Sequence, residues 1–213
     1  MRIRVLDEQE QELQDPYVLR LGGWSEERYL KEAPESQRWE FVRGEVLLYS
    51  PATAEHQELV GFLYRLLAEC CERQRWGKVL TGPAAVRLSS GVIREPDVFV
   101  LAPEDARQAQ GVPLSVVPTL IVEVMSPSTR TLDLGEKAQD YAQAGVPEYW
   151  AVDPERRALV VHALEKGRER YRVESVTEGW VRSRVVPGLR LRADWLWQEP
   201  LPPLIRCLQE ALP

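Results

Sequence analysis

The sequence Leu120-Ile121-Val122-Glu123-Val124-Met125 places one carboxylate inside an otherwise apolar run. An apolar run without alternation is typical of a central strand that is covered on both faces. An unpaired charge in such a strand is costly, so Glu123 needs a metal ion, an ion pair or a cleft. Two interpretations stay open at this point. Glu123 either pairs with an arginine or faces solvent on an edge strand, or it belongs to a functional site.

A second carboxylate begins another apolar run. Asp97 follows Pro96 and precedes residues 98–101, which read VFVL. By itself, an aspartate at the start of a strand is typically a turn residue. If the two strands are neighbours, however, Asp97 and Glu123 can converge on a hard divalent cation such as Mg²⁺, which prefers a few carboxylates plus water.

The segment after Glu123 predicts a helix over residues 132–144 that ends at Gly145. Its Asp133, Lys137 and Tyr141 are spaced i, i+4, i+8 and share one face. Lysine is rare in this chain, with four copies against 23 arginines. Lys137 either forms a surface pair with Asp133, which would contribute little, or directs its ammonium at the acidic site, where it would stabilise phosphate charge. Asp133 is also a candidate N-cap.

The rest of the chain predicts one α/β (α+β) domain built on a mixed central sheet flanked by helices. Ser25 is the expected N-cap of a short helix, residues 38–49 predict two strands joined at Arg43-Gly44, and residues 54–75 predict a long helix with one apolar stripe. We divide the domain into a leading segment (1–23), a core (24–195) and a C-terminal helix (196–213). Further strands are expected at 78–81, 84–88, 97–101, 148–152, 158–164, 169–175 and 180–186, and a closing helix near 203–211.

Composition narrows the class of protein. The 213 residues carry a net charge of −6 and 44% hydrophobic residues, which excludes a disordered tail and a protein whose whole surface binds nucleic acid. Cys70, Cys71 and Cys207 lack metal-type spacing and indicate buried free thiols. No apolar signal core begins the chain, and no apolar run approaches the ~20 residues of a membrane span, so we expect a cytoplasmic protein without membrane contact.

The charge is unevenly distributed along the chain. Residues 156–192 carry ten basic and four acidic side chains, a balance of +6, which leaves −12 for the remainder. Arg170 and Arg172 alternate on one predicted strand face and are candidate DNA contacts, with Trp180 available for stacking. The alternative is an ordinary solvated face or a subunit interface. We expect a homo-oligomer such as a dimer, paired through apolar residues near the C-terminus: Trp195, Leu196, Trp197 and Leu201.

Taken together, these segments resemble the Uma-type "putative restriction endonuclease" family within the PD-(D/E)XK nuclease superfamily. The resemblance spans roughly residues 24–195, and the stretch from Glu123 to Trp150 is its most specific part. The matching stretches are 39–46 (WEFVRGEV), Ser50-Pro51, Glu55-His56, 95–98 (EPDV), 121–129 (IVEVMSPST), Asp133, Lys137, Tyr141-Ala142 and 145–153 (GVPEYWAVD).

The resemblance implies a restriction-endonuclease-like core and Mg²⁺-dependent hydrolysis of DNA phosphodiester bonds, with Mn²⁺ as an alternative metal. Asp97 and Glu123 would be the metal-binding acids, and the Val124 carbonyl a further ligand. The superfamily's usual lysine lies two residues after the second acid, where this chain has Met125. Lys137 on the following helix would take over that role.

Further site residues follow from the same resemblance. Glu40 would be an additional catalytic acid, with its neighbour Glu45 as the alternative. Candidates for the cleft lining are His56, Glu45, Asp133 and Tyr141. Independently of the resemblance, Arg87 and Arg130 are candidate phosphate contacts, because they lie nearer the proposed acids in the sequence than the arginines of residues 156–192 do. His162 is interpreted as structural, and His56 has an equally plain interpretation as a polar residue at a helix start.

Two other functions remain open. A catalytically silent binding or assembly module would keep the fold without the activity, and Met125 and the acidic net charge favour it. A metal-dependent enzyme acting on a small phosphorylated molecule would share the metal site but would not bind DNA.

Overall fold

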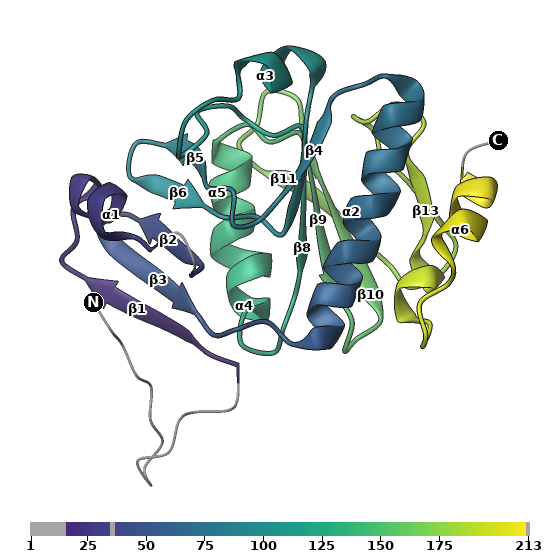
Figure 1. Cartoon of the computed structure of the whole chain (residues 1–213), viewed down its shortest axis with the longest axis horizontal. Helices are drawn as coiled ribbons and strands as arrows, with labels where there is room; N and C mark the ends of the chain where they lie inside the picture. The colour runs from purple at the N-terminus through teal and green to yellow at the C-terminus, as the bar shows by residue number, and fades with distance from the viewer. Residues whose placement is uncertain (1–15, 35–36, 212–213) are drawn as a thin grey trace, which may run out of the picture.

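The computed structural model describes residues 16–34 and 37–211. Most of the predicted leading segment 1–23 therefore lies outside the described residues. The described residues form two large β-sheets, with helices on the outer side of each, and one two-stranded sheet (Figure 1).

The central sheet has six strands in the order β11-β10-β9-β8-β7-β4. It is mixed, as predicted, because β8 and β9 run parallel while the other neighbours are antiparallel. The parallel pair needs a crossover connection, and the helical segment between the two strands supplies it. The strands are β4 (Lys78–Thr81), β7 (Val98–Leu101), β8 (Leu120–Val124), β9 (Glu148–Asp153), β10 (Ala158–Leu164) and β11 (Tyr171–Val176).

The crossover segment confirms the predicted helix but is not a uniform α-helix. It begins as α4 (Arg130–Leu132), continues as a π-turn η1 (Asp133–Lys137), and ends as α5 (Ala138–Gln143). Gly145 terminates it with a φ of +82°, the left-handed conformation that glycine adopts without strain. The i, i+4 pattern of the sequence does not distinguish a π-turn from an α-turn, and such turns are frequent at functional sites.

Two helices cover one face of the central sheet. Helix α2 (Ala54–Gln74) buries its apolar stripe, which includes Leu63, Leu66 and Leu67, and α6 (Leu204–Ala211) packs beside it (Figure 1). The sheet contributes alternate residues to this core, among them Val122 and Val124. Full burial of each such side chain contributes about 1.5–3 kcal/mol, so this interface anchors the strands that carry the site.

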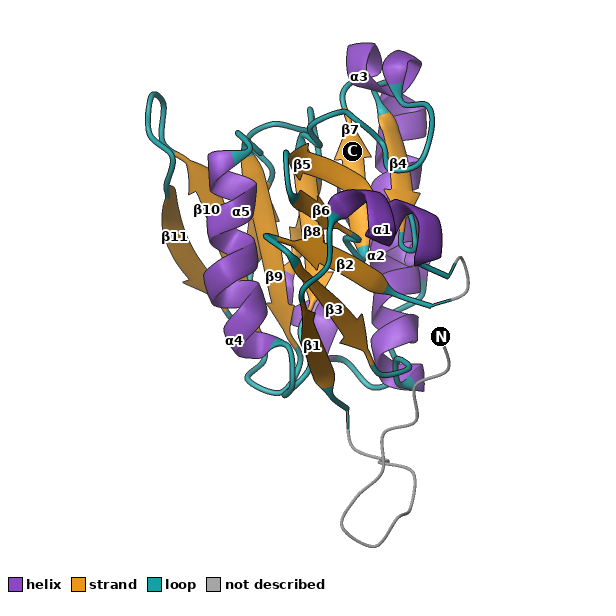
Figure 2. Ribbon diagram, turned by 90° about the vertical axis from the view of Figure 1, so that its left-hand side faces the viewer, coloured by secondary structure: helices purple, strands orange, loops and turns teal. Residues whose placement is uncertain are grey.

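A separate five-stranded antiparallel sheet, in the order β1-β3-β2-β6-β5, differs from the single sheet that the sequence predicts. Periodicity predicts where strands are but not which strands pair. Helix α1 (Glu26–Glu32), capped by Ser25 as predicted, covers this sheet through Tyr29 (Figure 2). The strands are β1 (Val18–Gly22), β2 (Trp39–Val42), β3 (Glu45–Tyr49), β5 (Val86–Ser89) and β6 (Val92–Arg94).

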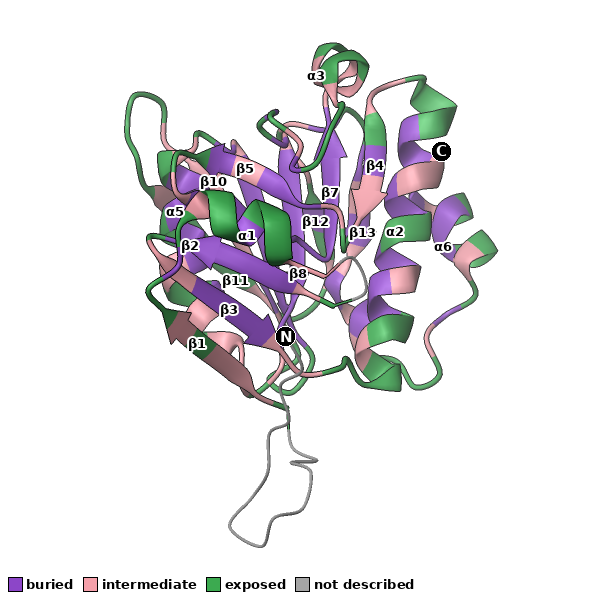
Figure 3. Cartoon of the chain, turned by 60° about the vertical axis from the view of Figure 1, so that its left-hand side comes forward, coloured by how far each residue is buried: buried purple, intermediate pink, exposed green. Residues whose placement is uncertain are grey.

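The opposite face of the central sheet packs against α5 and the five-stranded sheet. Ile121 and Tyr149 from the central sheet join Tyr141 from α5 and Val86 from β5 in one buried cluster. Strands β2, β7 and β8 are buried along their whole length, whereas β1 is partly exposed (Figure 3). The acid-bearing strands are therefore enclosed between two layers.

The C-terminal part does not offer the apolar pairing surface that the sequence predicts. Trp195 and Leu196 are buried in the core of the same chain, and Trp197 and Leu201 pack partly buried against it. Helix α6 confirms the predicted closing helix, and Cys70, Cys71 and Cys207 are buried free thiols, also as predicted. In the described part of the chain no helix is long and apolar enough to cross a membrane. The remaining elements are α3 (Pro103–Gln108), β12 (Trp180–Arg182), β13 (Arg190–Arg192) and the 3₁₀-helix η2 (Ala193–Trp197).

Candidate metal-binding cleft

Asp97 and Glu123 lie side by side at one end of the central sheet. Val98 of β7 pairs with Val122 of β8 in an antiparallel register, so the next residues along each strand, Asp97 and Glu123, face one another. Asp97 is 7% exposed and Glu123 is 1% exposed. The two acids therefore converge as the sequence predicts.

One oxygen of each carboxylate is held by hydrogen bonds from the surrounding protein. Oδ2 of Asp97 accepts the backbone N–H of Val124 at 2.8 Å. Oε1 of Glu123 accepts hydrogen bonds from Lys137 Nζ at 2.9 Å and from the Tyr141 hydroxyl at 2.6 Å. These contacts fix the orientation of both acids, so that the second oxygen of each points to a common space.

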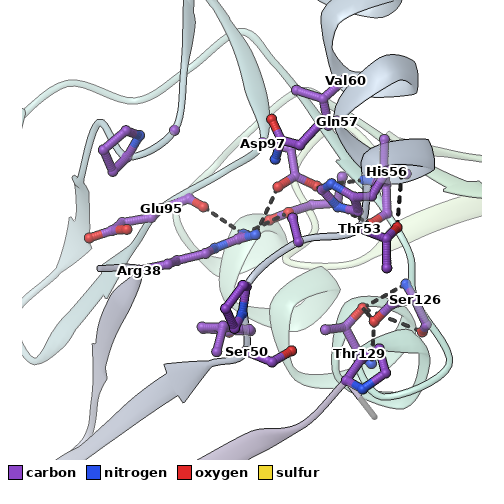
Figure 4. A pocket seen from close by; sticks show the side chains of 18 of the residues that line it. Arg38, Ser50, Thr53, His56, Gln57, Val60, Glu95, Asp97, Ser126 and Thr129 are labelled. Atoms are coloured by element: carbon purple, nitrogen blue, oxygen red, sulfur yellow. Dashed lines mark hydrogen bonds and ion pairs between the residues drawn. The ribbon is translucent and has the colours of Figure 1, made fainter. Parts of the chain in front are cut away.

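Arg38 occupies that space, and sequence reasoning missed it (Figure 4). Its Nη1 donates to Oδ1 of Asp97 at 2.8 Å, and its Nη2 lies 3.1 Å from Oε2 of Glu123. Nη2 also donates to the carbonyl oxygen of Glu95 at 2.6 Å. Arg38 is one of many arginines and lies in a polar stretch just before β2. The only signal that singles it out is its position immediately before the matching segment that begins at Trp39.

Lys137 is buried among three carboxylates, which excludes the surface-pair interpretation. Its ammonium lies 2.9 Å from Glu123, 2.9 Å from Asp133 and 3.8 Å from Glu40, and its side chain is 1% exposed. Burial alone would lower the pKa of Lys137, but the charges of these acids raise it well above its usual range. Lys137 is therefore a permanent cation.

Glu40 lies behind the two acids rather than in the cavity. It accepts hydrogen bonds from the Tyr49 hydroxyl at 2.5 Å, from Arg94 at 2.8 Å and from the backbone N–H of Glu95 at 3.1 Å. Burial would raise its pKa, but the charges of Lys137, Arg94 and Arg38 lower it to about 2. The alternative acid, Glu45, is 43% exposed and pairs with Arg20 instead.

The two central carboxylates differ in their affinity for protons. For Asp97, burial would raise the pKa, but the charge of Arg38 and the hydrogen bond from His56 hold it below its usual range. For Glu123, burial raises the pKa to about 7 against the opposing charge of Lys137, and the negative charge of Asp97 adds to the rise. Glu95 beside them has a pKa raised to about 8, chiefly by burial and then by the charge of Glu40.

His56 lies in the first turn of α2, where Thr53 is the N-cap. Its Nε2 is 3.0 Å from the Val124 carbonyl oxygen and 3.4 Å from Oδ2 of Asp97. Burial would lower the pKa of His56, but the hydrogen bond and charge of Asp97 raise it above its usual value. The predicted cleft position of His56 is thus observed, and the carbonyl predicted as a metal ligand contacts this ring.

A cavity of about 820 Å³ opens onto the two acids. Hydroxyl groups line its other side, where Ser126 and Thr129 hydrogen-bond to one another at 3.1 Å (Figure 4). Tyr141, Glu40 and Glu45 are not among the lining residues. Those that were predicted for the site and do line it are His56, Asp97, Glu123, Val124, Asp133 and Lys137.

The predicted DNA contacts do not line this cavity. Arg87 pairs with Glu26, and Arg130 pairs with Asp153 at 2.8 Å and with Glu155 at 2.5 Å. The other two predicted contacts are exposed residues near or on β11, the third strand from β8: Arg170, which pairs with Glu165 at 3.3 Å, and Arg172.

Behind the acids, a network of ion pairs joins the five-stranded sheet to the crossover helix. Arg94 of β6 is fully buried and contacts Glu40 at 2.8 Å, Glu136 at 2.6 Å and Asp140 at 2.5 Å. Arg20 of β1 reaches the same Glu136 at 2.5 Å. Sequence reasoning missed this network, because the partners lie far apart along the chain.

The donor set fits a hard divalent cation. Two carboxylates and a backbone carbonyl are oxygen ligands of the kind that Mg²⁺ accepts, and this ion keeps several waters rather than demanding an all-protein cage. Among residues 16–34 and 37–211, no group of three or more His, Cys, Asp or Glu side chains is arranged to hold a metal ion.

Comparisons with known proteins agree with this architecture. The sequence model of a family described as "Putative restriction endonuclease" (Uma2) matches residues 26–194. A crystal structure of "a putative nuclease belonging to DUF820" from Anabaena variabilis superposes with a TM-score of 0.65 at 14% sequence identity. The superposition covers 80% of this chain and 96% of that one. No curated protein matches the chain.

Proposed function

The chain belongs to the Uma2 "putative restriction endonuclease" family, and from this premise we propose that it is a Mg²⁺-dependent endonuclease that hydrolyses phosphodiester bonds in DNA, with Mn²⁺ as an alternative metal. The observation that carries the proposal is the adjacency of Asp97 and Glu123 with Lys137 bound to Glu123. Two adjacent acids can hold a metal ion and a buried ammonium can stabilise phosphate charge, and metal-assisted phosphodiester hydrolysis can use both.

Each residue of the site has a defined task in this proposal. Asp97 and Glu123 would hold the cation, with the Val124 carbonyl as a further ligand. When bound, a divalent ion lowers the pKa of a coordinated water and offsets the charge of the phosphate. Lys137 and Tyr141 orient the Glu123 carboxylate, and the ammonium adds a fixed positive charge beside the reacting phosphate.

Glu40 acts as a positioning residue in this scheme. It contacts Lys137 at 3.8 Å and Arg94 at 2.8 Å, but it does not line the cavity. Its low pKa keeps it ionised, which maintains the negative charge that holds Lys137 in place.

A cleavage assay tests the proposal. Purified protein is incubated with linear, supercoiled and single-stranded DNA in the presence of Mg²⁺ or Mn²⁺. We expect cleavage by the wild type and a loss of at least about 100-fold in Asp97→Asn and Glu123→Gln, because each variant removes a metal-binding charge. The matched control is Glu104→Gln, an exposed residue of α3. Cleavage that persists unchanged in both acid variants would overturn the assignment.

A silent binding module is the second candidate, and one observation favours it. Arg38 bridges Asp97 and Glu123, so that the two acids are satisfied without any metal. Calorimetry distinguishes the candidates, because only the nuclease requires a Mn²⁺ site that depends on both acids.

DNA longer than the cleft would need a further contact surface. We propose that Arg170 and Arg172, on the exposed edge of the central sheet, contribute it through phosphate contacts. We also propose that two copies of the chain act on one duplex, since cutting both strands commonly uses two active sites. Light scattering with and without DNA tests this stoichiometry.

A further inference from the structure

Arg38 takes the two carboxylate oxygens that the rest of the protein leaves available. The other oxygen of Asp97 accepts the Val124 N–H, and the other oxygen of Glu123 accepts bonds from Lys137 and Tyr141. The guanidinium bridges the two remaining oxygens at 2.8 and 3.1 Å. It therefore stands where a cation shared by both acids has to bind.

Arg38 is also the cation of the site that can leave most easily. Each of the two cations contacts three carboxylates, but the side chain of Arg38 is 25% exposed and lines the cavity, whereas that of Lys137 is 1% exposed. Among the described residues the Nε–H of Arg38 has no hydrogen-bond partner, although the guanidinium also contacts the Tyr49 ring, whose centre lies 4.7 Å away. A long, flexible side chain at the edge of a cavity can turn outward without disturbing the strands beneath it.

A divalent ion and the guanidinium cannot share these oxygens. Both are cations, and beside carboxylates that are 7% and 1% exposed their mutual repulsion is weakly screened. Lys137 and Arg94 already supply fixed positive charge close by. Loading of the metal therefore requires the removal of one positive charge from the acids.

We propose that Arg38 is a built-in competitor for the metal site, which holds the two acids together in the apo state and is displaced when a divalent cation binds. This inference rests on the proposed function, since it takes Asp97 and Glu123 as the metal-binding acids. The displaced guanidinium stays at the edge of the same cavity, where it can bind a phosphate oxygen.

Calorimetric titration with Mn²⁺ alone tests the inference without reference to activity. Removing the competitor in Arg38→Ala and in the longer Arg38→Gln is expected to lower the Mn²⁺ dissociation constant about tenfold or more, whereas the exposed control Arg73→Ala leaves it unchanged. Thermal melts without metal identify any variant that fails to fold. If Arg38→Ala does not fold, the titration of Arg38→Gln tests the inference in its place.

Chemical rescue separates direct competition from a general change in charge. About 20 mM guanidinium chloride, far below denaturing concentrations, is expected to weaken Mn²⁺ binding to Arg38→Ala by about threefold or more and to leave the wild type unaffected, with NaCl as the ionic-strength control. Equal effects of both salts on Arg38→Ala would overturn the inference.

The proposed metal site and the proposed role of Arg38 can fail separately. If Mn²⁺ binds equally well after Asp97→Asn and Glu123→Gln in the Arg38→Ala background, the metal site itself is wrong and the proposed function fails with it. If binding depends on both acids but both Arg38 variants bind Mn²⁺ as tightly as the wild type does, only the role of Arg38 is wrong.

Discussion

Lys137 Nζ lies 2.9 Å from Glu123 Oε1, and both side chains are 1% exposed. The lysine comes from the π-turn of the crossover segment, not from the strand that carries Glu123. Met125, two residues after Glu123, lies on the same strand face and is buried in an apolar cluster with Ala138 and Tyr141. Lys137 of the crossover segment thus supplies Glu123 with the basic partner that Met125, on the strand of Glu123 itself, cannot provide.

Lys137→Met is expected to reduce DNA cleavage by about 100- to 1,000-fold, because it removes a fixed positive charge from a site shielded from water. Initial cleavage rates with Mg²⁺ measure the effect. Lys78→Met is the matched control, since this lysine is exposed on β4. Wild-type rates in a folded Lys137→Met protein would refute a catalytic role for the ammonium.

Met125→Lys is expected to destabilise the protein by several kcal/mol without improving cleavage, although it places a lysine at the position where the family resemblance leads one to expect it. The new ammonium would be buried among apolar side chains with Lys137 already bound to Glu123. Urea denaturation measures the free energy of unfolding. Met125→Leu conserves volume and should cost less than about 1.5 kcal/mol. Equal stability of the two variants would contradict the buried position of Met125.

Arg94→Met is expected to lower the free energy of unfolding by about 3–5 kcal/mol, because it leaves Glu40 and Asp140 buried without their shared cation. The comparison is Arg206→Ala, which removes an exposed i, i+4 pair with Glu210 and should cost about 0–1 kcal/mol. Urea denaturation of both variants gives the difference, and a similar small cost for both would rule out a stabilising network around Arg94.

His162→Phe is expected to reduce the loss of stability between pH 7 and pH 5. Burial lowers the pKa of His162 below its ordinary value of 6.5, with only partial compensation from backbone hydrogen bonds. The unfolded chain then binds the proton more readily, so the contribution is fully present above about pH 6.5 and is lost as the pH falls, at no more than about 1.4 kcal/mol per pH unit.

Phenylalanine is the suitable replacement, because it keeps the stacking of His162 on Tyr149, whose ring centre lies 4.8 Å away. Urea denaturation at pH 7, 6 and 5 measures the slope. His56→Gln removes the other histidine of the chain and should leave the loss at acidic pH in place. An unchanged slope in His162→Phe would show that other groups account for the acid sensitivity.

Arg170→Ala and Arg172→Ala are each expected to weaken binding to long duplex DNA uniformly across sequences and to reduce the slope of log affinity against log salt concentration by about 1. Short duplexes that fill only the cleft should not respond. Filter binding at several salt concentrations measures both slopes. Arg107→Ala, exposed on α3, is the control. Salt slopes equal to that of the wild type would exclude β11 as a DNA surface.

Much of the site could be predicted because its acids interrupt regular patterns. Glu123 lies within an apolar run, and Asp97 begins a second apolar run. The helical spacing of Asp133, Lys137 and Tyr141 places all three on one helix face. All five lie close together in the structure, four of them on the cavity wall. The local pattern of each strand was enough to predict that Asp97 and Glu123 meet, because the antiparallel pairing of β7 and β8 places the ends of the two strands next to each other.

The parts of the site and of the fold that could not be predicted depend on contacts between segments that are distant in the sequence. Arg38 reaches acids 59 and 85 positions away, and Arg94 reaches Asp140 46 positions away. Neither arginine interrupts a local pattern in a chain with 23 arginines. The second sheet was missed for the same reason, since hydrophobic alternation identifies a strand but not the partner beside which it lies.

The ion pairs between β6 and the crossover helix also bear on how this protein unfolds. Arg94 ties the five-stranded sheet to Glu136 and Asp140 of the crossover segment, which packs on the central sheet, so we expect the two sheets to open together. Both walls of the cleft then belong to a single cooperative unit, and their amide protons should exchange with solvent at the rate of global unfolding. The strands that position Asp97 and Glu123 would therefore keep their arrangement until the whole molecule unfolds, and only the Arg38 side chain would move when a cation binds.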